Sequence, residues 1–213
     1  SLESSEMLIS AVPSEFLRQT LKEIKPYFKN QIIVSATKGI EHSTSKRMSQ
    51  VIEDELGNAK IAVLSGPNHA EEVSRKMPTA SVVASKDKRT GKIAAEFIGT
   101  NTFKLYQLND VAGVEICGAL KNISAIATGV CDGFGFGDNA RASIITLGLM
   151  EMNNFGRRFG AKRGTVYGLA GVGDLIATCT SRHSRNRFVG EQLAKNKSIE
   201  EIKKEMHGMI AEG

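Results

Sequence analysis

The chemistry that this sequence can support starts from a lysine in apolar surroundings. Lys121 lies in the run GVEICGALKNISA (residues 113–125), with Gly118 and Ala125 about one helical turn away on either side. Burying an unpaired ammonium group is costly, so two interpretations are open. The stem of Lys121 can lie along apolar surface while its ammonium reaches water. Alternatively, a partly desolvated cleft lowers its pKa enough for proton exchange near neutral pH.

A carboxylate further along the chain bears on that choice. Asp174 stands in GVGDLI (residues 171–176), again among glycines and aliphatic residues, and can pair with Lys121 and orient it. A helix N-cap is the other interpretation of Asp174, because aspartate after glycine suits that position. If the two side chains pair, general acid–base chemistry is the expected use of Lys121.

Residues 184–187, Ser-Arg-Asn-Arg, suit the binding of a phosphate or a carboxylate. They are predicted to open a helix, where backbone N–H groups and the helix dipole add to the side-chain donors. A solvated basic helix start is the alternative. Positive charge at a helix N-terminus is mildly unfavourable without an anion, which favours the anion site.

The first hundred residues alternate between runs typical of strands and runs typical of helices. Such alternation predicts βαβ units around a largely parallel sheet that is covered on both faces. The predicted strands are 7–12, 31–36, 60–64 and 79–84, and the predicted helices are 14–27, 44–56 and 88–98.

Three of the predicted strands lead into loops that can form one crevice. Pro13 follows the first strand, Lys38 the second, and Gly66 and Asn68 the third. Ligands bind at the carboxyl edge of an open α/β sheet. Taken singly, each loop is better explained by the backbone requirements of a turn.

After about residue 108 the strand patterns give way to helical spacing. We expect an α/β domain over residues 1–108 and an all-α domain over 109–213, with Lys121 on the first long helix of the latter. Glycines at 133, 135 and 137 break the first two of these helices apart. The predicted helices are 111–130, 140–159, 187–195 and 199–206.

Composition limits the class of protein. The chain has 213 residues, 41% hydrophobic and 24% charged, and a net charge of +5 that fits a small anionic substrate without requiring a nucleic acid. Its three cysteines have unrelated spacings, which argues against disulfides and zinc. No uninterrupted apolar run approaches membrane-spanning length, and no signal-peptide pattern opens the chain. We expect a cytoplasmic protein with no metal, no nucleic-acid partner and no membrane span.

Several motifs together resemble the family of NAD(P)-dependent sn-glycerol-3-phosphate dehydrogenases. They are Gly118–Asn122 (GALKN), Cys131–Gly137 (CDGFGFG) and Ser184–Arg187 (SRNR). The resemblance extends from LISAVP (residues 8–13) through ATKG (36–39) and SGP (65–67) to Ala211-Glu212-Gly213. It therefore covers nearly the whole chain.

The resemblance implies a fold and a reaction. Residues 1–108 would be the later part of a Rossmann-like doubly wound sheet, hence a partial dinucleotide-binding domain. Residues 109–213 would be the truncated all-α substrate domain. The implied reaction interconverts dihydroxyacetone phosphate and sn-glycerol 3-phosphate by hydride transfer with NAD or NADP, and feeds glycerophospholipid synthesis. A homodimer is implied as well.

The resemblance also implies roles for individual residues. Lys121 would exchange the proton at the C2 oxygen, Asp174 would belong to its hydrogen-bond network, and Lys38 would lie between cofactor and substrate. The implied substrate-binding residues are Lys38, Gly66, Asn68, Lys121, Asn122, Asp174, Thr178, Ser184, Arg185 and Asn186. The implied cofactor-binding residues are Pro13, Phe16, Lys38, Ala70, Arg185, Ile210 and Glu212.

One departure from the family is large. The family begins with a strand and a Gly-x-Gly-x-x-Gly turn, and no such turn occurs in this sequence. We therefore expect the chain to lack the first βαβ unit, the residue that separates NAD from NADP, and the family's last helices. Two alternatives remain open: a related β-hydroxyacid or 6-phosphogluconate-type dehydrogenase, and a non-catalytic remnant of the same fold.

Overall fold

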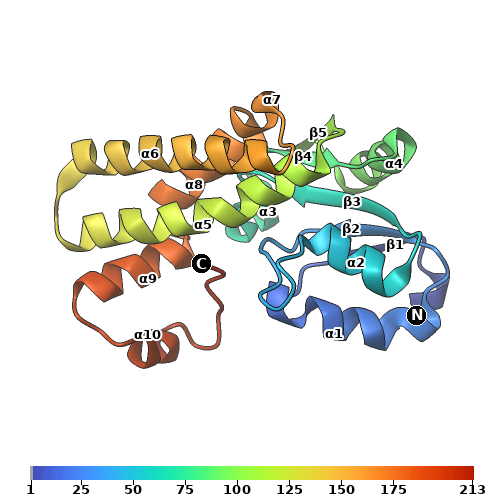
Figure 1. Ribbon diagram of the computed structural model, residues 1–213, viewed down its shortest axis with the longest axis horizontal. Helices are drawn as coiled ribbons and strands as arrows, with labels where there is room; N and C mark the ends of the chain where they lie inside the picture. Colours follow the sequence, from blue (N-terminus) through green and yellow to red (C-terminus); the bar gives the residue numbers. More distant parts are fainter. Residues whose placement is uncertain (1) are drawn as a thin grey trace.

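A five-stranded sheet is followed by a layer of helices in the computed structural model, which describes residues 2–213 (Figure 1). The strands stand in chain order across the sheet, and only β3 and β4 pair antiparallel. Their bounds are β1 (Met7–Ser10), β2 (Ile32–Ser35), β3 (Lys60–Ser65), β4 (Thr79–Ala84) and β5 (Phe103–Leu108). The predicted α/β class with a largely parallel sheet is confirmed.

Successive residues of β2 explain why both faces of the sheet are covered. Side chains alternate between the faces of a strand. Ile33 packs with Leu17 and Leu21 of α1 (Ser14–Ile24) and with α2 (Met48–Leu56), whereas Ile32 and Val34 pack with α4 (Lys88–Ile98) on the other face. A strand buried on both faces reads as the continuous aliphatic run IIV.

Three details of this half differ from the sequence-based expectation. β5 was not predicted, although its alternation FKLYQL fits an edge strand with Phe103 buried. The helix expected over 44–56 begins only at Met48, because the preceding residues form a turn closed by an Ile40–Arg47 bridge. The helix expected over 14–27 ends at Ile24, and the 3-10 turn η2 (Lys25–Tyr27), which contains Pro26, follows it.

The second half is helical, and no strand follows Leu108 in the described part of the chain. Its long helices α5 (Val111–Gly133) and α6 (Gly137–Arg158) are antiparallel neighbours (Figure 1). The shorter elements are α7 (Arg163–Val166), the π-helical turn η3 (Leu169–Gly173), α8 (Asp174–Thr180), α9 (Arg185–Ala194) and α10 (Ile199–Glu205). The break predicted at Gly133–Gly137 is present, and Gly135 and Gly137 have positive φ angles of 71° and 81°.

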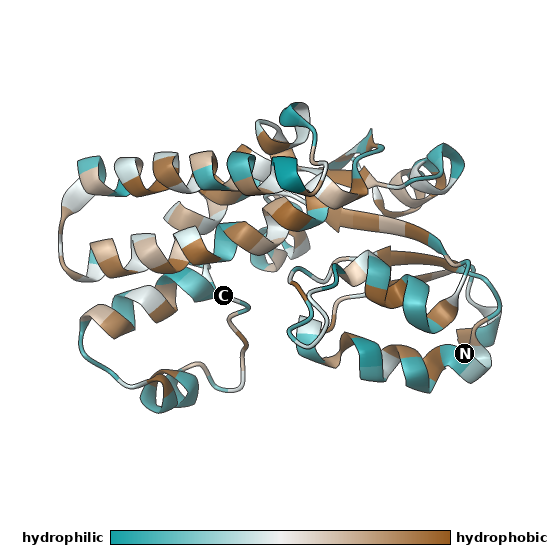
Figure 2. Ribbon diagram, viewed as in Figure 1, coloured by the Kyte–Doolittle hydropathy of each residue, from teal (hydrophilic) through white to brown (hydrophobic). Residues whose placement is uncertain are grey.

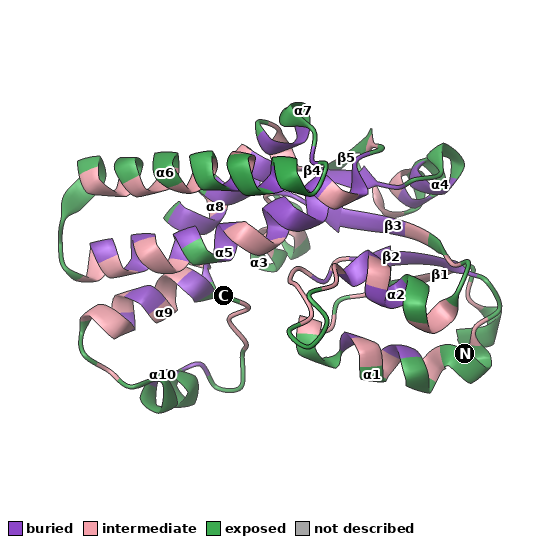
Figure 3. Ribbon diagram, viewed as in Figure 1, coloured by how far each residue is buried: buried purple, intermediate pink, exposed green. Residues whose placement is uncertain are grey.

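Helix α5 is more deeply buried than the helices around it. Most of α5 is buried, whereas α6 presents an exposed outer side and α10 is largely hydrophilic (Figures 2 and 3). By length and composition α5 could also cross a membrane, and 61% of its most apolar stretch is buried inside the fold.

Two buried carboxylates fix the start of α5. Asp110 caps the helix by accepting a hydrogen bond from the Gly113 N–H at 2.9 Å, and it also accepts from Thr165 Oγ1 of α7 at 2.6 Å. Glu115 accepts from the Ser49 N–H and Oγ, both at 2.6 Å, at the start of α2. These bonds attach the helix that carries Lys121 to both halves of the molecule.

The other end of α5 lies against α9 through glycines. A Cβ atom on Gly129 would stand 2.0 Å from the Arg187 carbonyl oxygen, and one on Gly190 would stand 2.0 Å from the Ile126 carbonyl oxygen. Gly133 is similarly close to Ala194 and Glu191. Only hydrogen in place of a side chain lets the two backbones approach this closely, and the approach brings the start of α9 beside Lys121 and Asn122.

Candidate active site

A cavity of about 550 Å³ opens where the sheet meets α5, α8 and α9. It lies at the carboxyl ends of β1 and β2, the edge at which ligands bind in open α/β sheets. Most of the residues singled out from the sequence line it: Pro13, Lys38, Asn68, Ala70, Lys121, Asn122, Asp174, Thr178, Ser184, Arg185, Asn186, Ile210 and Glu212.

Lys121 and Asp174 form a direct ion pair. Lys121 Nζ donates to Asp174 Oδ1 at 2.6 Å and to Thr178 Oγ1 at 2.7 Å, and the Thr178 hydroxyl donates to the Asp174 carbonyl oxygen at 2.6 Å. Both charged residues are buried, with exposed fractions of 6% and 2%. Among the described residues no third acceptor is present for the ammonium, so one of its N–H bonds remains for a ligand.

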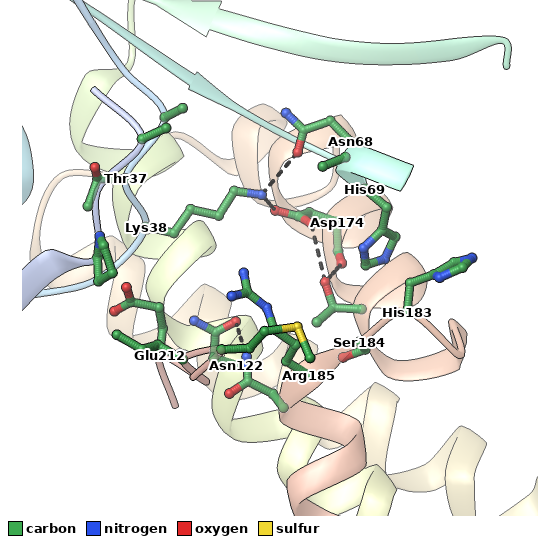
Figure 4. A pocket seen from close by; sticks show the side chains of 18 of the residues that line it. Thr37, Lys38, Asn68, His69, Asn122, Asp174, His183, Ser184, Arg185 and Glu212 are labelled. Atoms are coloured by element: carbon green, nitrogen blue, oxygen red, sulfur yellow. Dashed lines mark hydrogen bonds and ion pairs between the residues drawn. The ribbon is translucent and has the colours of Figure 1, made fainter. Parts of the chain in front are cut away.

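Asp174 is shared with a second lysine. Lys38 Nζ donates to Asp174 Oδ2 at 2.7 Å and to Asn68 Oδ1 at 3.3 Å (Figure 4). It also donates to the Gly66 carbonyl oxygen at 3.2 Å. Three acceptors use all the donors of this ammonium. Asp174 is the first residue of α8 and its carboxylate makes no capping bond, so the N-cap interpretation is wrong.

Gly118 lies where α5 packs closely against the sheet and the Lys38 stem. A Cβ atom on Gly118 would lie 3.5 Å from Lys38 Cγ and 3.1 Å from Ser65 Oγ. The contact with Lys38 would be ordinary van der Waals packing, and only the contact with Ser65 Oγ would be tight. This is the close packing that the small residues around Lys121 predict from the sequence.

Burial and neighbouring charges shift the pKa values of this group. Burial lowers the pKa of Lys121 to about 8, helped by the positive charge of Lys38 and opposed by Asp174. Burial acts to raise the pKa of Asp174, but the two lysines outweigh it and hold that pKa below its usual range. Asp174 is therefore ionised, and Lys121 can exchange a proton near neutral pH.

Arg185 differs from both lysines, because it has no protein partner. Its side chain is exposed, lines the cavity, and makes no hydrogen bond or ion pair with the described residues. Figure 4 shows its guanidinium extending into the space between Asn122 and Asp174. An unpaired guanidinium in a cavity is suited to bidentate recognition of a phosphate or carboxylate.

Ser184 and Asn186, on either side of Arg185, form hydrogen bonds within the protein. Ser184 is the N-cap of α9, and its Oγ accepts from the Arg187 N–H at 3.2 Å. Asn186 Nδ2 donates to Asn122 Oδ1 at 3.0 Å, and Asn186 Oδ1 accepts from the Gly213 N–H at 2.9 Å. Of the residues predicted to bind an anion, Ser184 and Asn186 are therefore engaged in bonds within the protein, whereas Arg185 is not.

The last residues of the chain close one side of the cavity. The Glu212 carboxylate accepts from the Ser14 N–H at 3.0 Å and from Ser14 Oγ at 2.6 Å, at the start of α1. Met209, Ile210 and Glu212 line the cavity. Residues almost two hundred positions apart thereby meet at the carboxyl edge of β1.

Two predicted site residues are not part of the cavity wall. The Phe16 side chain is 51% exposed, because its neighbour Leu17 takes the inward face of α1. Gly66 contributes only through its carbonyl oxygen, which accepts from Lys38.

Sequence reasoning missed several residues of the wall, among them two histidines. His69, at the start of α3 (Ala70–Ser74), and His183, before α9, have ring centroids 6.3 Å apart. Adjacency to Asn68 and Ser184 was the one signal that could have found them. The other residues missed are Ala11, Val12, Ala36, Thr37, Glu71 and Met209.

The cysteines are free and buried. Burial raises the pKa of the Cys117 thiol to about 12 and that of Cys179 to about 11, so neither is an activated nucleophile.

The cavity fits one end of a dinucleotide cofactor. Its sheet-side wall combines small apolar groups, including Pro13, with Ile210 from the end of the chain, beside the polar groups of Glu212 and Arg185. A flat apolar ring with a polar amide suits such a wall. No Gly-x-Gly-x-x-Gly turn for the pyrophosphate occurs in the sequence.

Comparisons with known proteins agree on one family. Residues 1–91 match the family model described as the NAD-dependent glycerol-3-phosphate dehydrogenase N-terminus, and residues 110–213 match the model for its C-terminus.

Individual relatives are similar along nearly the whole chain. A glycerol-3-phosphate dehydrogenase (NAD(P)+) of Chlorobium phaeobacteroides is 49% identical over 99% of this chain and 64% of its own length. One of Desulfitobacterium hafniense is 46% identical over 100% of this chain and 60% of its own. The crystal structure of glycerol-3-phosphate dehydrogenase from Coxiella burnetii has a TM-score of 0.95 at 40% identity, over 100% of this chain and 65% of that one. The chain thus spans less than two thirds of the length of these relatives.

Proposed function

The chain belongs to the NAD-dependent glycerol-3-phosphate dehydrogenase family, as its motifs predict, and we propose that it interconverts dihydroxyacetone phosphate and sn-glycerol 3-phosphate. The family uses NAD or NADP. The observation that carries the proposal is the combination of a buried Lys121–Asp174 pair with an unpaired Arg185 in one cavity. The pair suits proton exchange and the guanidinium suits a phosphate.

In the proposed reaction Lys121 is the general acid and base. When bound, the nicotinamide would give a hydride to C2 of dihydroxyacetone phosphate or accept one from C2 of glycerol 3-phosphate. Lys121 protonates the developing C2 alkoxide through its free N–H bond during reduction. During oxidation the neutral amine removes the same proton. Its pKa of about 8 allows both directions near neutral pH.

The residues around Lys121 have supporting roles in this proposal. Asp174 holds the ammonium in place, and Lys38 adds positive charge that lowers the Lys121 pKa and attracts an anionic substrate. Arg185 would bind the phosphate, with donors from the start of α9. The remaining substrate contacts would come from Gly66, Asn68, Asn122, Thr178, Ser184 and Asn186.

The residues proposed to hold the cofactor lie on both sides of the cavity. Arg185 and Lys38 would contact it beside the substrate. The others are Pro13, Phe16, Ala70, Ile210 and Glu212. Except for Phe16, they line the cavity, which supports this assignment.

The remaining expectations are also proposals. We divide the chain into a dinucleotide-binding part over residues 1–108 and a substrate-binding part over 109–213. The change from strand to helix between Leu108 and Val111 supports this division. A cytoplasmic homodimer that serves glycerophospholipid metabolism is proposed from family membership.

An activity assay tests the proposed function against both alternatives. The full-length protein is purified and given NADH or NADPH with dihydroxyacetone phosphate, and nicotinamide oxidation is followed by absorbance. We expect turnover with this substrate and none with 6-phosphogluconate and NAD(P)+. Turnover of 6-phosphogluconate would support the related dehydrogenase class. Binding of dihydroxyacetone phosphate without turnover would support the non-catalytic alternative.

A further inference from the structure

The end of α5 carries a partly buried carboxylate that the proposed reaction does not use. Asp132 belongs to the run CDGFGFG, and its side chain is 8% exposed. Asp132 Oδ1 accepts from Arg141 Nε of α6 at 2.8 Å, and Oδ2 accepts from Arg187 Nε of α9 at 2.7 Å. One carboxylate therefore joins three helices.

Arg187 connects this carboxylate to the active site. It lies two residues after Arg185 in the first turn of α9, but its side chain contacts Asp132 while Arg185 lines the cavity. Between them, Asn186 bonds to Asn122 next to Lys121. The first turn of α9 is thus held at two points, one beside the cavity and one at Asp132.

The glycine contacts set which face of α9 meets α5. A Cβ atom on Gly129 or Gly190 would stand 2.0 Å from the facing backbone, so a large rotation of α9 that brought a residue with a side chain into this contact would clash. Against smaller rotations, the first turn of α9 is held by the directional side-chain hydrogen bonds of Asn186 and Arg187. Without Asp132, Arg187 would keep only its pair with Glu191 at 2.7 Å, which belongs to the same helix and gives no tie to α5.

Resting on the proposed function, we propose that Asp132 is a positioning residue for substrate binding. By holding Arg187 it fixes the fine rotation of the first turn of α9 that the glycine contacts leave open, and so the place of the Arg185 guanidinium in the cavity. The Asp132 carboxylate itself does not line the cavity. It acts on the ligand only through α9.

A double-mutant cycle in binding tests this proposal. Calorimetry on the full-length protein measures the Kd of dihydroxyacetone phosphate in the presence of NAD(P)+, a combination that cannot turn over. Asp132→Asn keeps the shape and removes the charge, and should weaken binding about 3- to 10-fold. In an Arg185→Ala background the same change should have no further effect, because the group being positioned is gone.

Asp138→Asn is the matched control. The Asp138 side chain is 93% exposed and pairs with Arg141 alone, so the Kd should not change. A merely structural role of Asp132 would lower stability without this dependence on Arg185. If Asp132→Asn does not fold, Arg187→Lys, which keeps the charge but lacks Nε, is measured in the same cycle.

Two results would overturn the proposal. One is an unchanged Kd in Asp132→Asn. The other is equal weakening with and without Arg185. Turnover is assayed separately, so a wild-type protein that binds dihydroxyacetone phosphate without reducing it contradicts the proposed function while the cycle still decides the role of Asp132. A wild-type protein that does not bind this ligand contradicts both.

Discussion

The two sides of the active-site cavity differ in how far their charges are already paired. On one side Lys38, Asp174, Lys121 and Thr178 form a buried network in which a single free N–H bond remains. On the other, Arg185 lines the cavity and has no hydrogen-bond or ion-pair partner among the described residues. Groups that move protons need fixed geometry before the substrate arrives, whereas a group that binds an anion gains its partner from the substrate.

The largest effect is expected from a substitution in the buried network, the paired side of the cavity. Lys121→Met keeps the apolar stem and removes the proton donor, so kcat for dihydroxyacetone phosphate should fall roughly 10²–10⁴-fold with little change in KM. Steady-state kinetics measure this. Lys104→Met, an exposed lysine of β5, is the control and should behave as wild type. An unchanged kcat in Lys121→Met would rule out general acid–base catalysis by this residue.

A substitution of Arg185, on the unpaired side of the cavity, should weaken substrate binding instead. Arg185→Ala removes a charge-assisted contact of about 1.5–3 kcal/mol, so KM for dihydroxyacetone phosphate should rise roughly 10- to 100-fold. The free energy of unfolding should stay within about 0.5 kcal/mol of wild type, because the exposed Arg185 side chain makes no hydrogen bond or ion pair with the described residues.

Dihydroxyacetone, which lacks the phosphate, separates binding from chemistry in this variant. It should be a poor substrate of the wild type and little worsened by Arg185→Ala. An equal loss with both substrates would show that Arg185 does not bind the phosphate.

A smaller effect is expected at the contact between α5, which carries Lys121, and α9, which carries Arg185. Gly129→Ala places a Cβ atom against the Arg187 carbonyl oxygen and should reduce the free energy of unfolding by about 1–3 kcal/mol, as urea denaturation measures. Gly164→Ala is the matched control, because nothing lies within 4 Å of its Cβ position. Equal stabilities of the two variants would contradict the close α5–α9 contact.

The pairing of Lys121 with Asp174 could be predicted from the sequence because charged residues are unusual in such apolar surroundings. Lys121 and Asp174 are charged residues among glycines and aliphatic side chains, which makes a mutual pairing plausible without any structure. The buried strands β2 and β3 were found for a related reason, since their aliphatic runs leave few alternatives.

The contacts that could not be predicted join distant parts of the chain. Lys38 and Asp174 are 136 positions apart, and Glu212 and Ser14 are 198 apart. Each residue alone fits a turn, a helix start or a solvated surface, so only the assembled fold shows its partner. β5 was missed although its alternation was readable, because only Phe103 of its six residues is buried, and such an edge strand carries a weak signal.

The pH dependence of both reaction directions tests most directly whether Lys121 exchanges the proton. The protonated ammonium is needed for reduction and the neutral amine for oxidation, and the pKa of Lys121 is about 8. With dihydroxyacetone phosphate, kcat/KM should be level below about pH 8 and fall tenfold per pH unit above it. With glycerol 3-phosphate, kcat/KM should instead fall below about pH 8. The residual activity of Lys121→Met should show no such change of slope, or bend, near pH 8 in either direction. A bend that persists in Lys121→Met, or its absence from the wild type, would contradict the assignment of Lys121 as the proton donor and acceptor.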